Sequence, residues 1–483
     1  MHYGISKSPE NFQQAEVLVV GIFDDFESKD LPLTNNQLTQ INLLAKHLSK
    51  AKQHRSFYTE EGQCVIVIHC GDRSSYDILS LKNLLKTIFE RQEIEQALSI
   101  HLLMPTIEGL SNSEMLHQLV VHTDFNLYQF NHFKTNAKEQ PTHHDKTIRF
   151  YMPDCEDSII AKASALCHGI RLTRDLANHP SNVCTPSFLA ETAKQLEKQF
   201  ANVACKVMGK KEMKEMGMNL LLSVSQGSSK EPQLIELTYE NGGAEAPIVL
   251  VGKGITFDTG GYSIKPREAL EEMKFDMCGA ATVIGVIKAI AEAKLPVNVV
   301  GIIAATENLV NSEATKPGDV FTSMSGKTVE IVNTDAEGRL ILADALTYAE
   351  RFKPAFVIDI ATLTGAIVIS LGSVYSGIFS QDEQLANDIM TASKQTQDLF
   401  WRMPIHQEYA DMLSSPVADM ANATWDRSAG AITAAWFLSN FTKKYRWAHC
   451  DIAGTAYQSG KKRNATGRPV SMLFQLIENQ VKQ

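Results

Sequence analysis

The chain has 483 residues, of which 44% are hydrophobic and 21% charged, which is typical of a soluble globular protein with a large core. No apolar run reaches the roughly 20 residues that a membrane-spanning helix needs. The net charge of −9 argues against broad electrostatic binding to nucleic acid, although it leaves a local basic patch open. The length fits about three domains of roughly 150 residues, or two unequal domains.

The first residues, MHYGISKSPENFQQAE, contain no basic segment followed by an apolar core of about 7–15 residues, so no secretory signal is expected. The eight cysteines are scattered without a C-x-x-C pair, and some lie inside apolar runs such as Cys64–Ile68. We interpret them as reduced, buried thiols, and we therefore expect a cytoplasmic protein.

Residues 1–155 alternate between strand-like and helix-like patterns. Strands are expected at Val17–Ile22, Cys64–Ile68 and Ser99–Leu103, and helices at Leu38–Leu48 and Leu79–Phe89. This alternation predicts a separate α/β module with its own sheet. It contains no catalytic constellation.

The polar stretch at residues 135–147 is the most linker-like part of the chain. His143, His144 and Asp145 lie in it and could suggest a metal site, but no third ligand follows at helical or hairpin spacing, so an exposed loop is the better interpretation. An apolar stripe then predicts a helix over Asp157–Leu176, which the segment 177–186 would stop.

From residue 235 onward strands and helices alternate again. Strands are expected at Ile235–Tyr239, Ile248–Val251, Val297–Ala304, Thr328–Val332 and Ala355–Ile360, and helices at Gly279–Ala293 and Glu337–Phe352. Alternating elements of this kind predict a mixed, mostly parallel sheet between helices.

Seven charged residues stand in segments that are otherwise apolar or glycine-rich, namely Lys253, Asp258, Lys265, Asp276, Asp335, Glu337 and Arg339. A strand that leads into a glycine-rich turn would deliver Lys253 and Asp258 to the carboxyl edge of a sheet, where open α/β folds have their sites. Asp335 and Glu337 directly precede the periodic apolar run 340–346, so both are expected at a helix N-terminus.

Two explanations fit these charges. Any one of them alone is adequately explained as a solvated charge or a helix cap. Together they are harder to explain in that way, because carboxylates gathered on a buried sheet edge repel one another unless cations neutralise them. A pair of divalent metals such as Mg²⁺, Mn²⁺ or Zn²⁺ is the simpler solution.

Three further residues are weaker candidates. Asp344 and Asp359 are expected to support the ligands and not to contact a metal directly. Cys278 stands beside Asp276 without a histidine nearby in sequence, and no G-x-S-x-G motif indicates a serine nucleophile.

The same segments resemble the M17 family of leucyl aminopeptidases, which are dinuclear metallo-exopeptidases. NTDAEGRL at 333–340 matches the family signature without a change, and the other family motifs follow in the expected order over roughly residues 170–483: VGKGITFDTGG, SIKP, MKFDMCGAA, PGD, ADMAN, AGAITAA, DIAGTA and ATGRPV. The resemblance implies an α/β protein with an N-terminal α/β domain (1–156), a connecting helix (157–180) and a larger catalytic domain (181–483). The loop 309–316, Phe275 and Cys278 depart modestly from the family pattern.

Carried over residue by residue, the resemblance implies two bound cations, Mn²⁺ or Zn²⁺, with Mg²⁺ and Co²⁺ as alternatives. Lys253, Asp258, Asp276 and Glu337 would bind one, while Asp258, Asp335 and Glu337 would bind the other. A lysine ligand must lose its proton, which requires a pKa strongly lowered by metal charge. Lys265 would stabilise the developing oxyanion, and Arg339 would hold a bicarbonate that acts as the general base.

The resemblance also implies a pocket for the first residue of a peptide, lined by Met273, Thr362, Gly365, Ala453 and Ala456. This lining is apolar and includes small residues, so leucine and methionine should fit best. The family further implies a homohexamer.

Two alternatives from other classes stay open at this stage. The chain could be a catalytically idle binding protein that keeps the fold, although all five implied ligands and both catalytic cations are intact. It could also have a DNA-binding or regulatory role, which the acidic balance weakens.

Overall fold

The computed structural model describes residues 1–27, 31–135, 146–426 and 428–481. Clustering of contacts divides the chain into two compact units, Met1–Cys167 and His168–Gln483, which we call the N-terminal unit and the C-terminal unit. The division falls within the long helix α5 (Asp157–Asn178). The boundaries 156/157 and 180/181 stay a prediction. The histidine pair at 143 and 144 lies outside the described residues.

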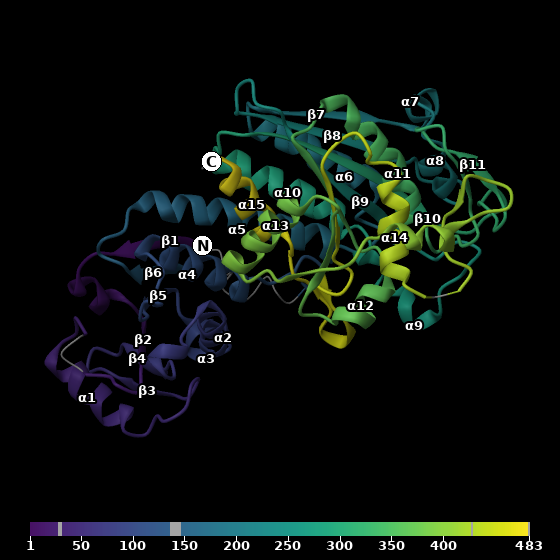
Figure 1. Ribbon diagram of the computed structural model, residues 1–483. Helices are drawn as coiled ribbons and strands as arrows, with labels where there is room; N and C mark the ends of the chain where they lie inside the picture. The colour runs from purple at the N-terminus through teal and green to yellow at the C-terminus, as the bar shows by residue number, and fades with distance from the viewer. Residues whose placement is uncertain (28–30, 136–145, 427, 482–483) are drawn as a thin grey trace. The chain divides into compact units, whose positions relative to one another are not determined.

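The N-terminal unit has a six-stranded sheet in the order β1-β6-β5-β2-β4-β3 (Figure 1). Only β3 is antiparallel to its neighbour. The strands are β1 (His2–Ser6), β2 (Val17–Ile22), β3 (His54–Tyr58), β4 (Cys64–His69), β5 (Ser99–Leu103) and β6 (Thr147–Tyr151), and the helices are α1 (Asn35–Ala45), α2 (Ile78–Phe89), α3 (Gln92–Gln96) and α4 (Asn112–Leu127).

The central strands β2 and β4 are buried along their whole length, which explains their near-continuous apolar sequence. On one face Leu18, Val20, Val65 and Val67 form a core with Ile41 of α1. The α/β module expected from the sequence is therefore present, with β2 and β5 at the expected residues.

The C-terminal unit has an eight-stranded mixed sheet in the order β15-β14-β17-β13-β9-β10-β8-β7. Its central strands β17, β13, β9 and β10 are parallel to one another, and antiparallel strands flank them. The strands are β7 (Val203–Met208), β8 (Gln233–Glu240), β9 (Ile248–Asp258), β10 (Asn298–Asn308), β13 (Phe356–Ala361), β14 (Ser376–Phe379), β15 (Phe400–Arg402) and β17 (Trp447–Asp451). Five short strands make two small sheets: β11 (Val320–Thr322), β12 (Thr328–Glu330) and β16 (Met420–Ala421), and β18 (Tyr457–Gln458) and β19 (Asn464–Ala465).

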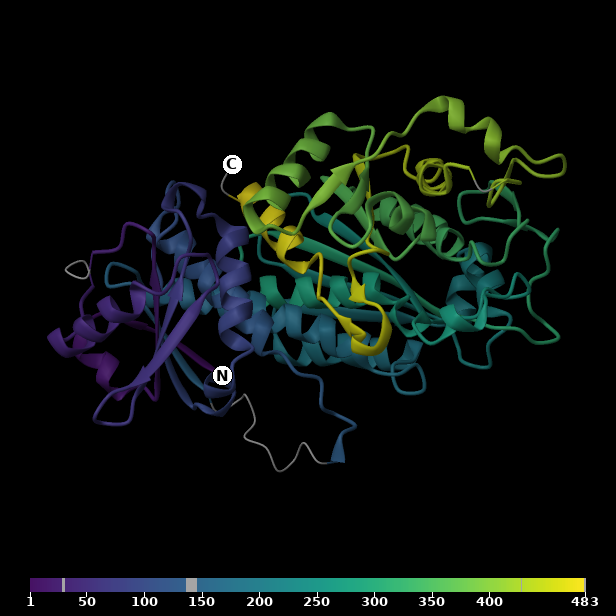
Figure 2. The same cartoon turned by 90° about the horizontal axis from the view of Figure 1, so that it is seen from below.

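Helices cover both faces of this sheet (Figures 1 and 2). On one face α8, α11 and α14 build an apolar core with Val249 and Val251 of β9. On the other face α10 packs so closely that a Cβ at Gly252 would lie 2.7 Å from the Gly279 oxygen. The helices are α6 (Pro186–Gln199), α7 (Lys210–Glu215), α8 (Asn219–Ser225), α9 (Arg267–Leu270), α10 (Cys278–Glu292), α11 (Gly338–Ala349), α12 (Gly365–Leu371), α13 (Glu383–Thr396), α14 (Gly430–Ser439) and α15 (Val470–Val481).

The strand β9 is longer than its sequence pattern indicated. We expected a turn after Val251, but pairing with β10 continues through Asp258 and includes Gly252-Lys253-Gly254. Neighbours on both sides, β10 and β13, bond to this segment and hold the glycines extended. The mixed, mostly parallel sheet between helices is confirmed.

Candidate metal centre

A bulge in β9 places Lys253 and Asp258 on the same face of the sheet. Side chains alternate along a strand, so residues five apart would normally point to opposite faces. Opposite β10, however, Ile255 pairs with Thr306 and Asp258 pairs with Asn308, so β9 contains one extra residue there. Lys253 pairs with Ala304, and Ala304 and Asn308 share a face because they are four apart. Both charged side chains thus reach the face covered by α11.

The remaining carboxylates come from two turns beside this strand. Asp276 lies between a 3₁₀ turn (Met273–Phe275) and α10, while Asp335 and Glu337 lie just before α11, with Glu337 as its N-cap. Gly338 follows, and a Cβ there would lie only 2.7 Å from Lys253 Nζ, so only glycine leaves room for the lysine. The expected position at a helix N-terminus is confirmed for both carboxylates.

These turns bring the five implied ligands and Lys265 together. Lys253 Nζ lies 2.8 Å from Asp276 Oδ1 and 2.9 Å from Glu337 Oε1. Lys265 Nζ lies 2.9 Å from Asp258 Oδ2 and 2.5 Å from Asp335 Oδ1. Among the described residues, Asp258, Asp335 and Glu337 each offer an oxygen within 4.8 Å of the other two, a spacing at which one cation can bind all three.

Several oxygens of this cluster are not hydrogen-bonded. Asp276 Oδ2 has no hydrogen-bond partner, and Glu337 Oε1 and Asp335 Oδ1 face lysine ammonium groups without hydrogen-bond geometry. Buried carboxylate oxygens normally accept hydrogen bonds, so such orphaned oxygens need another positive partner. A divalent cation fits this donor set, which consists of hard oxygens and one amine.

The pKa shifts indicate the same shortage of positive charge. Burial and the Glu337 carboxylate raise the pKa of Asp258 to about 8. Burial raises the pKa of Asp276 to about 6, although Lys253 opposes this shift. For Glu337 burial is outweighed by Lys253 and Lys265, which lower its pKa. Two acids are thus pushed toward neutrality in a site whose lysines do not balance its carboxylates.

With only protein groups around it, Lys253 has a raised pKa, whereas a lysine that binds a metal needs a lowered one. Burial alone would lower its pKa, but the carboxylates of Asp276, Glu337 and Asp258 outweigh burial and raise it. The lowered pKa that a lysine ligand requires therefore depends on the metal charge itself.

Arg339 is buried at the second residue of α11. Its Nη1 donates to the Asn422 carbonyl oxygen at 2.8 Å, while its Nε is buried without a hydrogen-bond partner. Burial lowers the pKa of Arg339 to about 10, so the side chain stays protonated at neutral pH. A buried guanidinium with an unused N–H is suited to bind a small anion.

Three polar residues hold the cluster in place: the sequence interpretation missed Asn308 and Thr334 in this role and assigned Thr362 to the substrate pocket. Asn308 donates to Asp258 Oδ1 at 2.7 Å, and Thr362 Oγ1 donates to Asp276 Oδ1 at 2.8 Å. Thr334 Oγ1 donates to the Gly260 carbonyl oxygen and joins the two ligand-bearing loops. Asn308 could have been found from the sequence, because it is polar and ends an apolar strand next to β9.

The implied pocket residues lie at the carboxyl ends of two neighbouring strands and in the 3₁₀ turn. Thr362 and Gly365 follow β13, and Ala453 and Ala456 follow β17, which pairs with β13 in parallel. Met273 is partly exposed three residues before Asp276, whereas Ala456 is only 2% exposed and offers little surface. Asp451 joins the two loops, since it accepts from the Leu363 and Ala453 N–H groups.

The weaker candidates have other roles. Asp344 accepts hydrogen bonds from the backbone N–H groups of Leu221 and Met324. Asp359 accepts from Trp447 Nε1 and lies 2.6 Å from His449 Nδ1, two residues before the carboxyl end of β13. Burial raises the pKa of the Cys278 thiol, which makes it a poor nucleophile. The cysteines are free, and all but Cys205 are buried.

Known proteins are similar to this chain in sequence. Residues 171–474 match the model of the cytosol aminopeptidase family, catalytic domain. The chain is 48% identical over 481 residues to a probable cytosol aminopeptidase of Legionella pneumophila (strain Corby), covering 99% of each chain. It is 43% identical over 492 residues to a probable cytosol aminopeptidase of Aeromonas hydrophila, covering 98% of this chain and 97% of the relative.

A solved structure has a similar fold. The bottromycin maturation enzyme BotP in complex with Mn superposes with a TM-score of 0.85 at 28% identity, over 97% of this chain and 100% of that one. The fold, the carboxylate-rich site and the relatives together define an enzyme that is a peptidase. More specifically, the chain belongs to the M17 family of cytosol, or leucyl, aminopeptidases.

Proposed function

We propose that this protein is a metal-dependent aminopeptidase that uses two divalent cations to remove apolar residues from the N-termini of peptides. The observation that carries the proposal is the cluster of buried Asp258, half-buried Asp335 and buried Glu337, whose oxygens lie within 4.8 Å of one another beside the orphaned Asp276 Oδ2. The manganese complex of BotP, a protein of similar fold, supports a divalent cation here.

In this proposal Lys253, Asp258, Asp276 and Glu337 bind one cation, and Asp258, Asp335 and Glu337 bind the other. The two cations would supply Lewis acidity, by which a water is activated and the scissile carbonyl is polarised. Mn²⁺ and Zn²⁺ are the metals that we expect first.

Two cationic side chains serve the reaction beside the ligands. Lys265 has a side chain that is 16% exposed, so its ammonium group can reach a substrate and stabilise the oxyanion that develops on the carbonyl oxygen. Arg339, whose Nε is buried without a hydrogen-bond partner, would hold a bicarbonate, which would supply a general base for the attacking water.

Specificity follows from the pocket residues and from the free amine of the substrate. The pocket lined by Met273, Thr362, Gly365, Ala453 and Ala456 favours leucine and methionine, because charged side chains would lose their hydration there. A free α-amine would bind to a cation, which restricts cleavage to the N-terminal residue.

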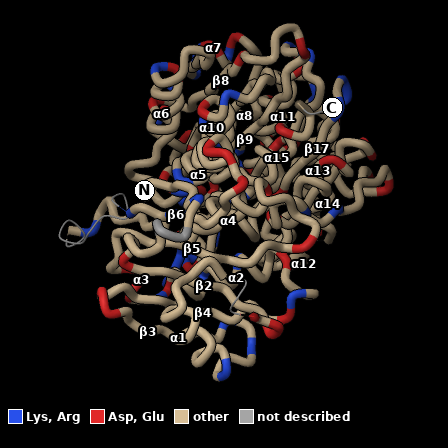
Figure 3. The backbone as a smooth tube through the Cα atoms, turned by 90° about the vertical axis from the view of Figure 1, so that its left-hand side faces the viewer, with Lys and Arg blue, Asp and Glu red and all other residues tan. Residues whose placement is uncertain are grey.

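A homohexamer in the cytoplasm is part of the same proposal. The C-terminal unit exposes several large apolar side chains, which supports burial of this surface in an assembly: Val368, Ile369, Val374, Trp401, Val417 and Trp425. Among the described residues, no helix combines the length and apolar character that crossing a membrane requires. In the view of Figure 3, basic and acidic residues are both scattered along the chain, and with the net charge of −9 this argues against broad binding of nucleic acid but leaves a local basic patch open.

The experiment is dialysis against a chelator, followed by addition of Mn²⁺ or Zn²⁺, with leucyl anilide as substrate. We expect activity to be lost on dialysis and restored by the metal, at a stoichiometry of two ions per chain. Full turnover by a preparation shown to be free of metal would refute the proposal.

A further inference from the structure

The N-terminal unit contains a cavity of about 300 Å³ that the aminopeptidase function does not use. Its walls come from the segments that follow β2, β4, β5 and β6, so it opens at the carboxyl edge of the parallel strands. A cavity of this size is in the range of known small-molecule sites.

The strand order places this cavity at the switch point of the sheet. After β2 the chain goes on to β3 and β4 on one side, whereas after β5 it goes on to β6 on the other side. The loops after β2 and β5 therefore leave neighbouring strands in opposite directions and open a crevice between them. In open α/β sheets this crevice is where ligands bind.

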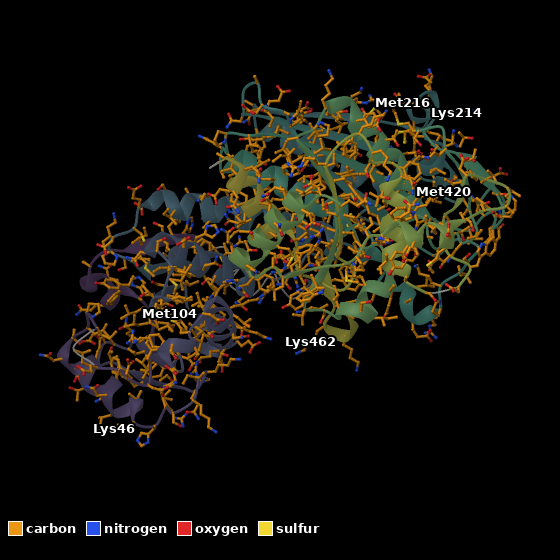
Figure 4. All side chains as sticks on the ribbon, in the orientation of Figure 1. Lys46, Met104, Lys214, Met216, Met420 and Lys462 are labelled. Atoms are coloured by element: carbon orange, nitrogen blue, oxygen red, sulfur yellow. The ribbon has the colours of Figure 1, made fainter. Side chains whose placement is uncertain are left out.

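The lining is mostly apolar and contains three aromatic side chains, Phe23, Phe26 and Tyr151, together with Met104. Met104, labelled in Figure 4, is only 6% exposed. The Phe23 ring is held from two sides, by Tyr76 at 5.2 Å between ring centroids and by the Arg73 guanidinium at 4.5 Å. The Phe23 ring is thus held in place before any ligand arrives, and an aromatic lining suits a flat ring.

The charges at the cavity disfavour an anion. Arg73 is paired with Asp25, with two contacts of 3.2 Å each, and the carboxyl group of Glu27 also lines the cavity. At the start of α4 the Glu114 carboxylate already accepts from the N–H group of Ser111. Among the described lining residues, a phosphate entering here would lose its hydration without meeting an unpaired cation.

We propose that this cavity binds a neutral nucleoside. Its base would lie between the aromatic walls of Phe23, Phe26 and Tyr151, and its sugar hydroxyl groups would meet Asn112 and Thr106, which are exposed at the rim. Amide and hydroxyl side chains donate and accept hydrogen bonds and so match the hydroxyl groups of a ribose. The proposal concerns a site separate from the peptidase centre and does not depend on its mechanism.

Isothermal titration calorimetry of the full-length protein tests this proposal, with adenosine, guanosine, cytidine and uridine as separate ligands. We expect at least one nucleoside to bind with a dissociation constant in the micromolar range, and its 5′-monophosphate to bind roughly tenfold or more weakly. Free ribose, which lacks the base, is the comparison ligand and should give no binding heat.

A matched pair of variants assigns the binding to the cavity. Thr106→Trp places an indole at the rim and should abolish nucleoside binding, whereas Glu108→Trp adds the same indole to an exposed position of the same loop outside the lining and should leave it unchanged. No heat with any nucleoside at about 1 mM would overturn the proposal. It would equally be overturned by a monophosphate that binds more tightly than its nucleoside, or by binding that Thr106→Trp leaves intact.

Discussion

Asn308 Nδ2 donates a hydrogen bond of 2.7 Å to Asp258 Oδ1, and a second bond of 3.0 Å to the Thr334 carbonyl oxygen. One amide thus ties the carboxylate at the end of β9 to the loop that carries Asp335. The bond also fixes which oxygen of Asp258 is left for a cation, because Oδ1 already accepts from Asn308 and from the Gly260 N–H group.

Replacing Asn308 with alanine should therefore weaken metal binding by about 10–100-fold, because supporting hydrogen bonds orient metal ligands. Metal affinity can be measured by competition with a chromogenic chelator. As a control, Asn311→Ala alters an amide in the following loop, whose Nδ2 donates to the Gln226 carbonyl oxygen. Equal metal affinity of wild type and Asn308→Ala would show that Asp258 needs no such support.

Replacing a proposed metal ligand and replacing a proposed catalytic cation should have different effects on metal content and kcat. Asp258→Ala and Glu337→Ala remove a proposed bridging carboxylate and should empty both metal positions. Lys265→Ala and Arg339→Ala should keep the metal and lower kcat by about 10²–10³-fold, because they act on the transition state. Metal content and kcat must be measured on the same preparations. Loss of metal from Lys265→Ala with retention by Asp258→Ala would reverse the assignment.

The stability effect of Asp344 should depend on pH. Burial raises the pKa of Asp344 to about 7, from a value of 3.8 for an unburied aspartate. Between these pH values the folded state binds the proton more tightly than the unfolded state, so the contribution of Asp344 to the free energy of unfolding falls as pH rises. Asp344→Asn does not titrate and lacks this slope.

The stability difference between wild type and Asp344→Asn should therefore shift in favour of the variant between pH 5 and pH 8, by no more than about 4 kcal/mol. Urea unfolding of both proteins at the two pH values measures it. A shift in favour of wild type at pH 8 would mean that the bonds from Leu221 and Met324 outweigh the burial of the charge.

Substrate choice should be broad among aliphatic residues and strict at the amine. One methylene in an apolar pocket changes binding by only about 1–3 kcal/mol, so leucyl, methionyl and valyl anilides should differ modestly in kcat/KM. Aspartyl and glutamyl anilides should be poor substrates, and N-acetyl-leucyl anilide should not be cleaved. Preference for an acidic residue would locate the pocket elsewhere, and efficient cleavage of the acetylated substrate would rule out the amine as an anchor.

The assembly prediction has a direct physical test. If the exposed apolar side chains around Ile369 and Trp401 are buried between copies, sedimentation at micromolar concentration with metal present should give six times the mass of one chain. Ile369→Asp, at a side chain that is 90% exposed, should weaken the assembly, whereas Tyr58→Asp in the N-terminal unit serves as a control. A mass near that of a single chain would refute the hexamer.

Much of this fold could be predicted from the sequence, because hydrophobic periodicity reports elements that are buried on one or both faces. The strands β2 and β5 lie at the predicted residues, and α2 begins one residue earlier than predicted. The short strands β15, β16, β18 and β19 were not predicted, since two or three residues carry no periodic pattern.

The ligand cluster was predicted from charges in apolar surroundings and from the M17 motifs, and the structure brings Lys253, Lys265 and the four carboxylates together. The bonds from Asn308, Thr334 and Thr362 were not predicted. Each joins residues at least 50 positions apart, except the bond from Asn308 to Thr334, and a single sequence carries no record of such pairings.

The extra residue in β9 is needed for the position of the metal ligands and not for the packing of the sheet. If β9 paired regularly with β10 beyond Ile255, with no residue left over, Asp258 would point to the face opposite Lys253. The core on both faces would keep its residues, yet the two ligands of this strand would be divided between the faces. A variant with regular pairing between β9 and β10 would thus keep its fold and lose the ligand cluster.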